Sequence, residues 1–444
     1  MRIKIGKTEI GKTEIGKTEI GKTEIGKTEI GTLRSNAMEK SHRALVPGGG
    51  GQRYLGNRGL IALIAFLSAF VPLSTDLYLP ALPGMSRYFQ VSAEQVNLTL
   101  IFFFLFFAAG MLFWGPLSDR YGRRPILIAG LAIYSLAGFL CAISQDISQL
   151  ILFRILQAVG GSSASAVAMA MIKDVYDSRN REMILAWVSS MVLISPMAAP
   201  VLGALLLGIT SWRGIFVLLG VIGLIALSGS LALVETLNTR YTGTLGQSIG
   251  RLAVVAKNPG FLSLLIIFSL LSFSSMAFIA SSSYIYIDGF GLNEKLFSLY
   301  FAFNALGMIG GPMLYLRLSR RFARSSIIIA GFASTILGGL LIYLLGSLQP
   351  WMFAACLFPA TIMGSCIRTP GTNLMLEQQE EDTGSAAALM SCFGILMGSM
   401  GMGIISLEWS NTIQILGSMN ILVGLACLGL WLLLAERPFI KQIP

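Results

Sequence analysis

Two ionisable side chains lie within long apolar runs of this 444-residue chain. Asp76 lies in Ser74-Thr-Asp-Leu-Tyr-Leu-Pro80, near the far end of the first run, and Arg154 lies near the start of the fourth. A charge at the centre of a bilayer costs at least about 2.5–3.5 kcal/mol on insertion scales. Side chains that carry such a cost are candidates for function.

Counting residues from the ends of their runs puts Asp76 and Arg154 at similar depth, so the two side chains could pair. A carboxylate held between the attraction of an arginine and the cost of burial can exchange a proton as its site opens to each side. We therefore predict that Asp76 carries a coupled proton and that Arg154 tunes the affinity of Asp76 for that proton. The alternative is a static ion pair that locks two helices together.

A second cluster, residues 115–125, lies between two apolar runs and is called the charged loop below. It combines one acid and three arginines with glycine and proline, which permit turning and close backbone approach. We predict a basic loop at a membrane face that gates one side of the molecule. Its candidate residues are Gly115, Asp119, Arg120, Gly122, Arg123 and Arg124.

Polar residues in or near other apolar runs could line a substrate cavity, or could equally bond helix to helix. The candidates are Asn97, Gln157, Tyr284, Tyr286 and Asn304. Arg368 is expected to snorkel or to gate near the end of its run. Position 68 is Ser, so the first run offers no second carboxylate, and coupling is predicted to depend on Asp76 alone. An apolar cavity with one carboxylate suits a lipophilic neutral or cationic compound.

Residue types that serve metal, disulfide or enzymatic chemistry are not suitably arranged. The five cysteines lie in apolar segments without paired spacing, and the only histidine, His42, lies in a polar tail. We therefore expect no metal, no cofactor and no enzyme activity, with a polytopic membrane enzyme as a distant alternative.

Composition places these residues in a membrane protein. Apolar residues make up 54% of the chain and charged residues 12%, against about 25% charged in a soluble domain. The net charge of +10 could indicate a nucleic-acid partner, but the basic residues lie in the tail and in short loops, without interleaved aromatic residues. We expect partners to be lipid, protons and a small molecule, and no nucleic acid.

The first 58 residues are expected to be a disordered tail. Residues 6–30 are five copies of Gly-Lys-Thr-Glu-Ile, which match a P-loop pattern literally but lack the flanking strand and helix that a P-loop needs. Ser35-Asn36-Ala37 resembles a vector scar, so the tail up to residue 37 could come from an expression vector, with Met38 as the natural start.

The apolar runs predict twelve transmembrane helices, six on each side of a central loop at 235–258. The N-terminal bundle would be 59–234, the C-terminal bundle 259–434, and a tail 435–444 would follow. The predicted spans are near 59–83, 95–117, 125–144, 149–172, 183–208, 212–234, 260–287, 295–318, 325–346, 350–374, 383–407 and 411–434.

Loop charges predict the orientation. With the N-terminus inside, the cytoplasmic loops and C-terminal tail hold fifteen Lys and Arg, and the outer loops hold three. This satisfies the positive-inside rule and puts both termini in the cytoplasm.

An internal repeat indicates two related halves. Residues 117–130 align without gaps on residues 318–331, at an offset of 201. The second copy has Arg320 in place of Asp119 and Ala323 in place of Gly122, so a weaker gating role is expected there. Parallel six-helix halves would put a substrate path between them, near the midplane.

The charged loop resembles the loop between helices 2 and 3 of the major facilitator superfamily, with the pattern G-x-x-x-D-R-x-G-R-R/K. Arg154, Gln157 and Gly160 are similar to the helix 4 pattern R-x-x-Q-G-x-G of its proton-driven exporters, with Ala158 in place of the first glycine. The helix 5 antiporter pattern is only partly kept, in residues 192–203.

Three further segments resemble the bicyclomycin/chloramphenicol-resistance (Bcr/CflA) group: residues 74–83, 152–157 and 212–216. The resemblance implies an all-α protein with twelve transmembrane helices in two parallel-repeat bundles. It implies a monomeric drug:proton antiporter of the bacterial inner membrane, exporting drug-like compounds by alternating access. The alternative is a proton-coupled exporter of a metabolite such as an amino acid or sugar.

Overall fold

The structure is a computed structural model that describes residues 52–176, 178–237, 245–379, 383–435, 437–438 and 440. The repeats expected to form a disordered tail, part of the central loop and most of the C-terminal tail lie outside these residues. Every regular element among the described residues is helical. The helices all belong to one compact unit, residues 49–444.

The first part of the chain forms the N-terminal helix group. Its elements are α2 (Gly56–Ser68), α3 (Phe70–Asp76), η1 (Leu79–Ala81), α4 (Leu82–Phe89), α5 (Ala93–Tyr121), α6 (Arg123–Ala142), α7 (Ile147–Val175), α8 (Ser178–Leu207) and α9 (Trp212–Leu231). Within this group α6 packs on α7 and α9, and α5 packs on α7.

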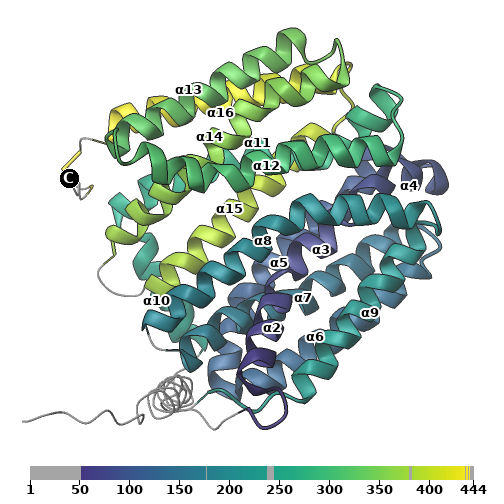
Figure 1. Cartoon of the computed structure of the whole chain (residues 1–444), viewed down its shortest axis with the longest axis vertical. Helices are drawn as coiled ribbons and strands as arrows, with labels where there is room; N and C mark the ends of the chain where they lie inside the picture. Colours follow the sequence, from purple (N-terminus) through teal and green to yellow (C-terminus); the bar gives the residue numbers. More distant parts are fainter. Residues whose placement is uncertain are drawn as a thin grey trace, which may run out of the picture. The chain divides into compact units, whose positions relative to one another are not determined.

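The second part forms the C-terminal helix group, preceded by the short helix α10 (Leu245–Ala256). Its elements are α11 (Pro259–Ser283), η2 (Tyr284–Gly289), α12 (Glu294–Leu318), α13 (Arg324–Leu345), α14 (Pro350–Glu377), α15 (Thr383–Ser406) and α16 (Thr412–Leu434). Figure 1 shows α13 beside α16, and α11 packs on α15 in the same group.

Ten helices among the described residues are long and apolar enough to cross a membrane, and the bent pair at the start of the chain would make eleven. Many large apolar side chains point outward from these helices, such as Leu136, Leu224 and Leu344, with exposed fractions of 63%, 45% and 62%. Such a surface suits lipid rather than water. The protein is therefore a multi-pass membrane protein.

The first predicted helix, near 59–83, is broken rather than continuous. Its axis bends by 45° between Gly56–Ser68 and Pro72–Phe89. Pro72 has no N–H to donate to the preceding turn, and the Ser68 hydroxyl bonds back to the Ile64 carbonyl at 2.8 Å. This break lies just before Asp76.

A second interruption, at Leu77 and Tyr78, follows Asp76 before η1 begins. Helix α8 approaches this point closely, because a Cβ atom at Gly203 would collide with the Leu77 carbonyl oxygen. The glycine therefore permits backbone contact between α8 and the interrupted segment. Asp76 is thus positioned between two breaks in its helix.

The two helix groups meet along two helix pairs. Helix α5 packs against α15, and α8 packs against α12. These pairs define the boundary at which the site described next is found.

Candidate functional site

A cavity of about 430 Å³ lies at the boundary between the two helix groups. The N-terminal group supplies Asp76 of α3 and Pro196 of α8, and the C-terminal group supplies residues of α11–α16. The wall is mainly apolar, with Phe278, Met276 and Leu357 among its members, and serine and threonine hydroxyls are interspersed. This size and character are typical of a small-molecule site.

Asp76 is the only carboxylate among the side chains that line this cavity. Its residue is 5% exposed, and Oδ1 accepts a hydrogen bond of 3.0 Å from the Thr75 hydroxyl. A carboxylate buried in this way faces a large cost for keeping its charge, so a bound proton relieves that cost. The arrangement can therefore bind and release a proton at the cavity wall.

Arg154 lies elsewhere, within the N-terminal helix group and fully buried. Its guanidinium carbon lies 4.1 Å from the Phe103 ring centre and 4.7 Å from that of Tyr78, which are cation–π distances. Its Nη1 donates to Gln157 Oε1 at 2.7 Å, and Nη2 donates to the Tyr78 hydroxyl at 3.4 Å. Aromatic faces and neutral dipoles therefore stabilise this cation.

The possible pairing of Asp76 with Arg154 is not realised in this structure. Among the described residues, no ion pair within 4.0 Å involves either side chain. Asp76 turns to the cavity, whereas Arg154 turns to the interior of its own group. The physical reason is helix rotation: residue counting gives depth, but the breaks around Asp76 decide which way its side chain points.

The predicted cavity residues separate into two kinds. Asn304 lines the cavity, with its Nδ2 donating to the Tyr300 carbonyl at 3.2 Å. The other three are not among the lining residues: Asn97, Gln157 and Tyr284. Gln157 is instead the acceptor for Arg154, and Asn97 bonds across the boundary between groups, as described below. Tyr286, also considered from the sequence, stacks on Tyr300 at 5.2 Å.

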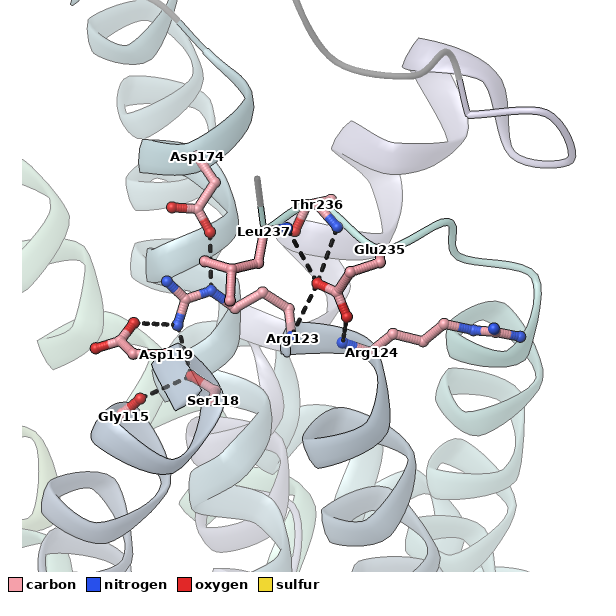
Figure 2. Close-up of polar contacts among 9 residues, drawn as sticks. All are labelled: Gly115, Ser118, Asp119, Arg123, Arg124, Asp174, Glu235, Thr236 and Leu237. Carbon is pink, nitrogen blue, oxygen red and sulfur yellow. Dashed lines mark hydrogen bonds and ion pairs between the residues drawn. The ribbon is translucent and has the colours of Figure 1, made fainter. Parts of the chain in front are cut away.

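The charged loop forms a polar network at one end of the N-terminal group (Figure 2). Arg123 is its centre: the guanidinium contacts Asp119 at 2.6 Å and Asp174 at 2.8 Å. The same group donates to the Ser118 hydroxyl at 2.6 Å. These contacts tie together α5, α6 and α7, so the network stabilises the arrangement of helices within one group.

Glu235 completes this network from beyond the end of α9. Its carboxylate accepts the backbone N–H groups of Arg123 at 2.9 Å and Arg124 at 3.1 Å, at the first turn of α6 (Figure 2). A carboxylate at a helix N-terminus satisfies free donors and is favoured by the helix dipole. Nothing local in the chain signals this cap, because Glu235 lies 112 positions from Arg123.

Two glycines of the charged loop have different roles. Gly122 is the single residue between α5 and α6, with a φ of +109° that other residues rarely adopt. Gly115 instead lies inside α5, and a Cβ there would meet nothing within 4 Å. The expectation of close approach and turning therefore holds for Gly122 and is wrong for Gly115.

The remaining arginines lie at the periphery of the network. Arg124 donates from Nη2 to the Leu231 carbonyl at 2.8 Å, which links α6 to the end of α9. Arg120 is exposed and lies over the Tyr121 ring, 5.5 Å from its centre. Tyr78 was not among the candidates, and Arg368 was expected to snorkel or to gate rather than to line the cavity, because an aromatic or basic residue in an apolar run gives no direction for its side chain.

At the opposite end of the helices, polar contacts join the two groups. Asn97 of α5 donates to Ser406 Oγ of α15 at 2.8 Å and to the Ala280 carbonyl of α11 at 3.3 Å. The Ser298 hydroxyl of α12 is shared between the Pro200 carbonyl of α8 at 2.9 Å and the Glu294 carbonyl of its own helix at 2.8 Å. The groups are therefore bonded at the end away from the charged loop.

Comparison with known proteins assigns the family. A sequence model described as Major Facilitator Superfamily matches residues 64–402. The chain belongs to this superfamily, which confirms the resemblance seen in the charged loop and gives the class as transporter rather than enzyme.

Curated relatives match over most of their length. An uncharacterized MFS-type transporter, YdgK of Bacillus subtilis, is 27% identical, with 85% of this chain and 96% of the relative covered. A chloramphenicol resistance protein of Pseudomonas aeruginosa is 29% identical, with 83% and 91% covered. The multidrug transporter MdfA of Escherichia coli O157:H7 is 28% identical, with 76% and 84% covered.

Solved structures share the fold. A D-xylose-proton symporter superposes with a TM-score of 0.65 at 16% identity, covering 86% of this chain and 98% of the symporter. A bacterial homolog of the human lysosomal transporter Spinster gives the same TM-score and identity, with 86% and 96% covered. At this identity the likeness concerns the all-helical fold alone.

Proposed function

We propose that this protein is a proton-coupled efflux transporter that exports small lipophilic drug-like compounds by alternating access. The observation that carries the proposal is Asp76 on the wall of a mainly apolar cavity between the two helix groups. A single buried carboxylate there can exchange a proton for cargo, because binding of one disfavours the other. Arg154 does not contact the cavity. It holds Tyr78, and with it the interrupted segment that follows Asp76, in position.

The relatives support the cargo class. Proteins named for chloramphenicol resistance and for multidrug transport match this chain over three quarters or more of its length. The apolar wall of the cavity suits the same kind of compound. Export of an amino acid or sugar is the outcome that the transport assay below must exclude.

The proposed topology has twelve spans in two six-helix bundles, 59–234 and 259–434. The bent pair at the start and α8 supply the two spans beyond the ten long apolar helices. Both termini and the charged loop would face the cytoplasm of a bacterial inner membrane, as the loop charges favour. We propose that the protein works as a monomer surrounded by lipid.

In this orientation, the contacts between the helix groups support an inward-facing state. The bonds of Asn97 and Ser298 close the outer end. On the inner side, the cavity lining reaches Met375, two residues before α14 ends at Glu377. The charged loop would then stabilise the N-terminal bundle while the inner end opens and closes.

The test is transport by purified protein in proteoliposomes with an imposed proton gradient. Wild-type protein should move chloramphenicol against its concentration gradient. The Asp76→Asn variant should lose uphill transport, because the amide cannot bind the coupled proton, while cargo binding and downhill exchange persist.

A matched variant, Glu94→Gln, removes an exposed carboxylate far from the cavity and should transport normally. Full proton-driven transport by Asp76→Asn would contradict the assignment of Asp76. Wild-type transport of amino acids or sugars, without transport of any drug-like compound, would contradict the proposed cargo.

A further inference from the structure

The cavity contains a second ionisable side chain, from the opposite helix group. Arg368 of α14 lies on its wall, with more than a third of the residue exposed. Asp76 and Arg368 are the only lining residues with an acidic or a basic side chain. The cavity therefore has a negative site on its N-terminal wall and a positive site on its C-terminal wall.

Arg368 has free donors. Among the described residues, no carboxylate lies within 4.0 Å of it, and no hydrogen bond from its guanidinium is formed. Arg324, by comparison, pairs with Glu377 at 2.8 Å near the end of the same helix. A guanidinium offers five N–H donors in a planar fork that matches carboxylate or nitro oxygens.

Arg368 lies within α14, more than two turns before the helix ends. It precedes Glu377 by nine residues, which is about 14 Å at 1.5 Å per residue. At this position the side chain lines the cavity between the helix groups. A cation at this depth is costly unless it lines a polar space or binds a partner.

We propose, resting on the export function above, that Arg368 binds the acceptor end of the cargo while Asp76 receives its donor end. The cargo class is then dipolar: zwitterions, and neutral compounds with a hydroxyl or amine at one end and a carboxylate or nitro group at the other. Asn304 lies on the same wall, and its amide oxygen has no hydrogen-bond partner among the described residues. Its amide is a further polar group in the same cavity.

Exchange of a proton for cargo requires that the cargo contacts both Asp76 and Arg368. When Asp76 takes up a proton, it loses the charge that attracts the donor end, so cargo binding weakens where release is needed. A simple anion bound to Arg368 alone would instead be held more tightly, because the cavity charge rises from zero to +1. A simple cation would gain from Asp76 and be repelled by Arg368. A dipolar cargo offers a donor end to Asp76 and an acceptor end to Arg368, so it is attracted by both side chains.

The experiment compares two probes that differ in one group. Ciprofloxacin carries an ammonium and a carboxylate, and its methyl ester keeps the ammonium and loses the carboxylate. Transport of each is measured in proteoliposomes with wild-type protein, Arg368→Gln and Arg368→Lys. Arg368→Gln should raise KM for ciprofloxacin by about tenfold or more, as expected for loss of a charge-assisted bond.

The same substitution should leave KM for the ester unchanged or lower, because the repulsion of the cation is gone. Arg368→Lys keeps the charge and should restore part of the affinity for ciprofloxacin. Arg321→Gln, at an exposed position outside the cavity, controls for loss of a positive charge. The quantity that decides is the ratio of the two KM values, since a structural defect would change both equally.

Two results would overturn the inference while leaving the export function intact. One is wild-type preference for the ester over ciprofloxacin, and the other is an equal effect of Arg368→Gln on both probes. Failure of wild-type protein to transport either probe or chloramphenicol would instead contradict the export function itself.

Discussion

Arg154 is a buried cation without a carboxylate partner among the described residues. Its charge is stabilised by the faces of Tyr78 and Phe103 and by the Gln157 oxygen. Burying a charge is costly, and such contacts offset the cost only when geometry is good. The Tyr78 hydroxyl is important because it also bonds Thr99 Oγ1 at 3.1 Å, which links the interrupted segment to α5.

This role of the hydroxyl leads to a prediction for Tyr78→Phe. The ring remains, but Arg154 and Thr99 each lose a buried hydrogen-bond partner, so the free energy of unfolding should fall by about 1–2 kcal/mol. The measurement is reversible denaturation of purified protein in mixed micelles. Tyr343→Phe, at a side chain that is 42% exposed, is the control and should change little. Equal losses in both variants would contradict the role given to the hydroxyl.

Residue types could be predicted from sequence at this scale, but partners could not. Asp76 and Arg154 stand out because charges in apolar runs are rare. Depth follows from counting residues, yet the direction of a side chain depends on helix rotation and on breaks such as the one at Pro72. The contact of Arg154 with Tyr78 therefore needed the three-dimensional structure.

At the scale of elements, the joint between α5 and α6 is a single residue, Gly122. The Glu235 carboxylate caps α6 from beside it, and an added Cβ would lie 2.6 Å from Glu235 Oε2. The one-residue joint between α5 and α6 and the capping of α6 by Glu235 both depend on the absence of a side chain at Gly122. The charged loop keeps this geometry only while residue 122 is glycine.

Gly122→Ala should therefore destabilise the protein, by about 1–3 kcal/mol for the strained backbone alone. The expected result is a lower denaturation midpoint in detergent, together with weaker transport. Gly115→Ala is the matched control for stability, because Gly115 is helical and has open space around it. That variant should be as stable as wild type or more so, by up to about 1 kcal/mol. Similar midpoints for the two variants would contradict this account.

The sequence predicted the loop but not its cap. The spacing of glycine, acid and arginines indicated a turn at a membrane face, and the structure has that turn at Gly122. Glu235 was beyond prediction, because a cap supplied by a distant helix end leaves no periodic or local signal in the chain.

At the scale of the whole molecule, two helix pairs join the groups, α5 with α15 and α8 with α12. Hydrogen bonds from Asn97 and Ser298 cross these boundaries at the end away from the charged loop. A transporter that opens at this end must break both bonds. Their strength therefore sets part of the equilibrium between inward-facing and outward-facing states.

Asn97→Ala should shift that equilibrium toward the outward-facing state by about fivefold, the effect of losing a bond worth about 1 kcal/mol. The measurement is the spin-label distance between Gln95→Cys and Lys295→Cys, on a background without native cysteines. The population with the longer distance should increase. Ser298→Ala should act in the same direction, whereas the exposed Ser148→Ala should not. An unchanged distance distribution in Asn97→Ala would contradict the proposed closure.

The all-helical class and the long membrane-spanning helices were accessible from sequence, because most apolar runs have the length of a span. The count of twelve in two six-helix bundles stays a prediction, supported by the ungapped repeat of residues 117–130 at 318–331. The broken first helix was not accessible from sequence, since its residues from 59 to 83 read as one apolar run. Breaks depend on how Pro72 and Ser68 compete with helical hydrogen bonds, and on the space that Gly203 leaves for the backbone.

A cavity with one carboxylate also has an electrical consequence. If one proton enters for each molecule that leaves, a neutral or zwitterionic cargo moves one net charge across the membrane, and a monovalent cation moves none. A potential of 100 mV then contributes about 2.3 kcal/mol to the first exchange, enough for about 50-fold accumulation. The potential contributes nothing to the exchange of a proton for a monovalent cation. The single carboxylate at Asp76 thus makes the charge of the cargo decide whether voltage drives its export.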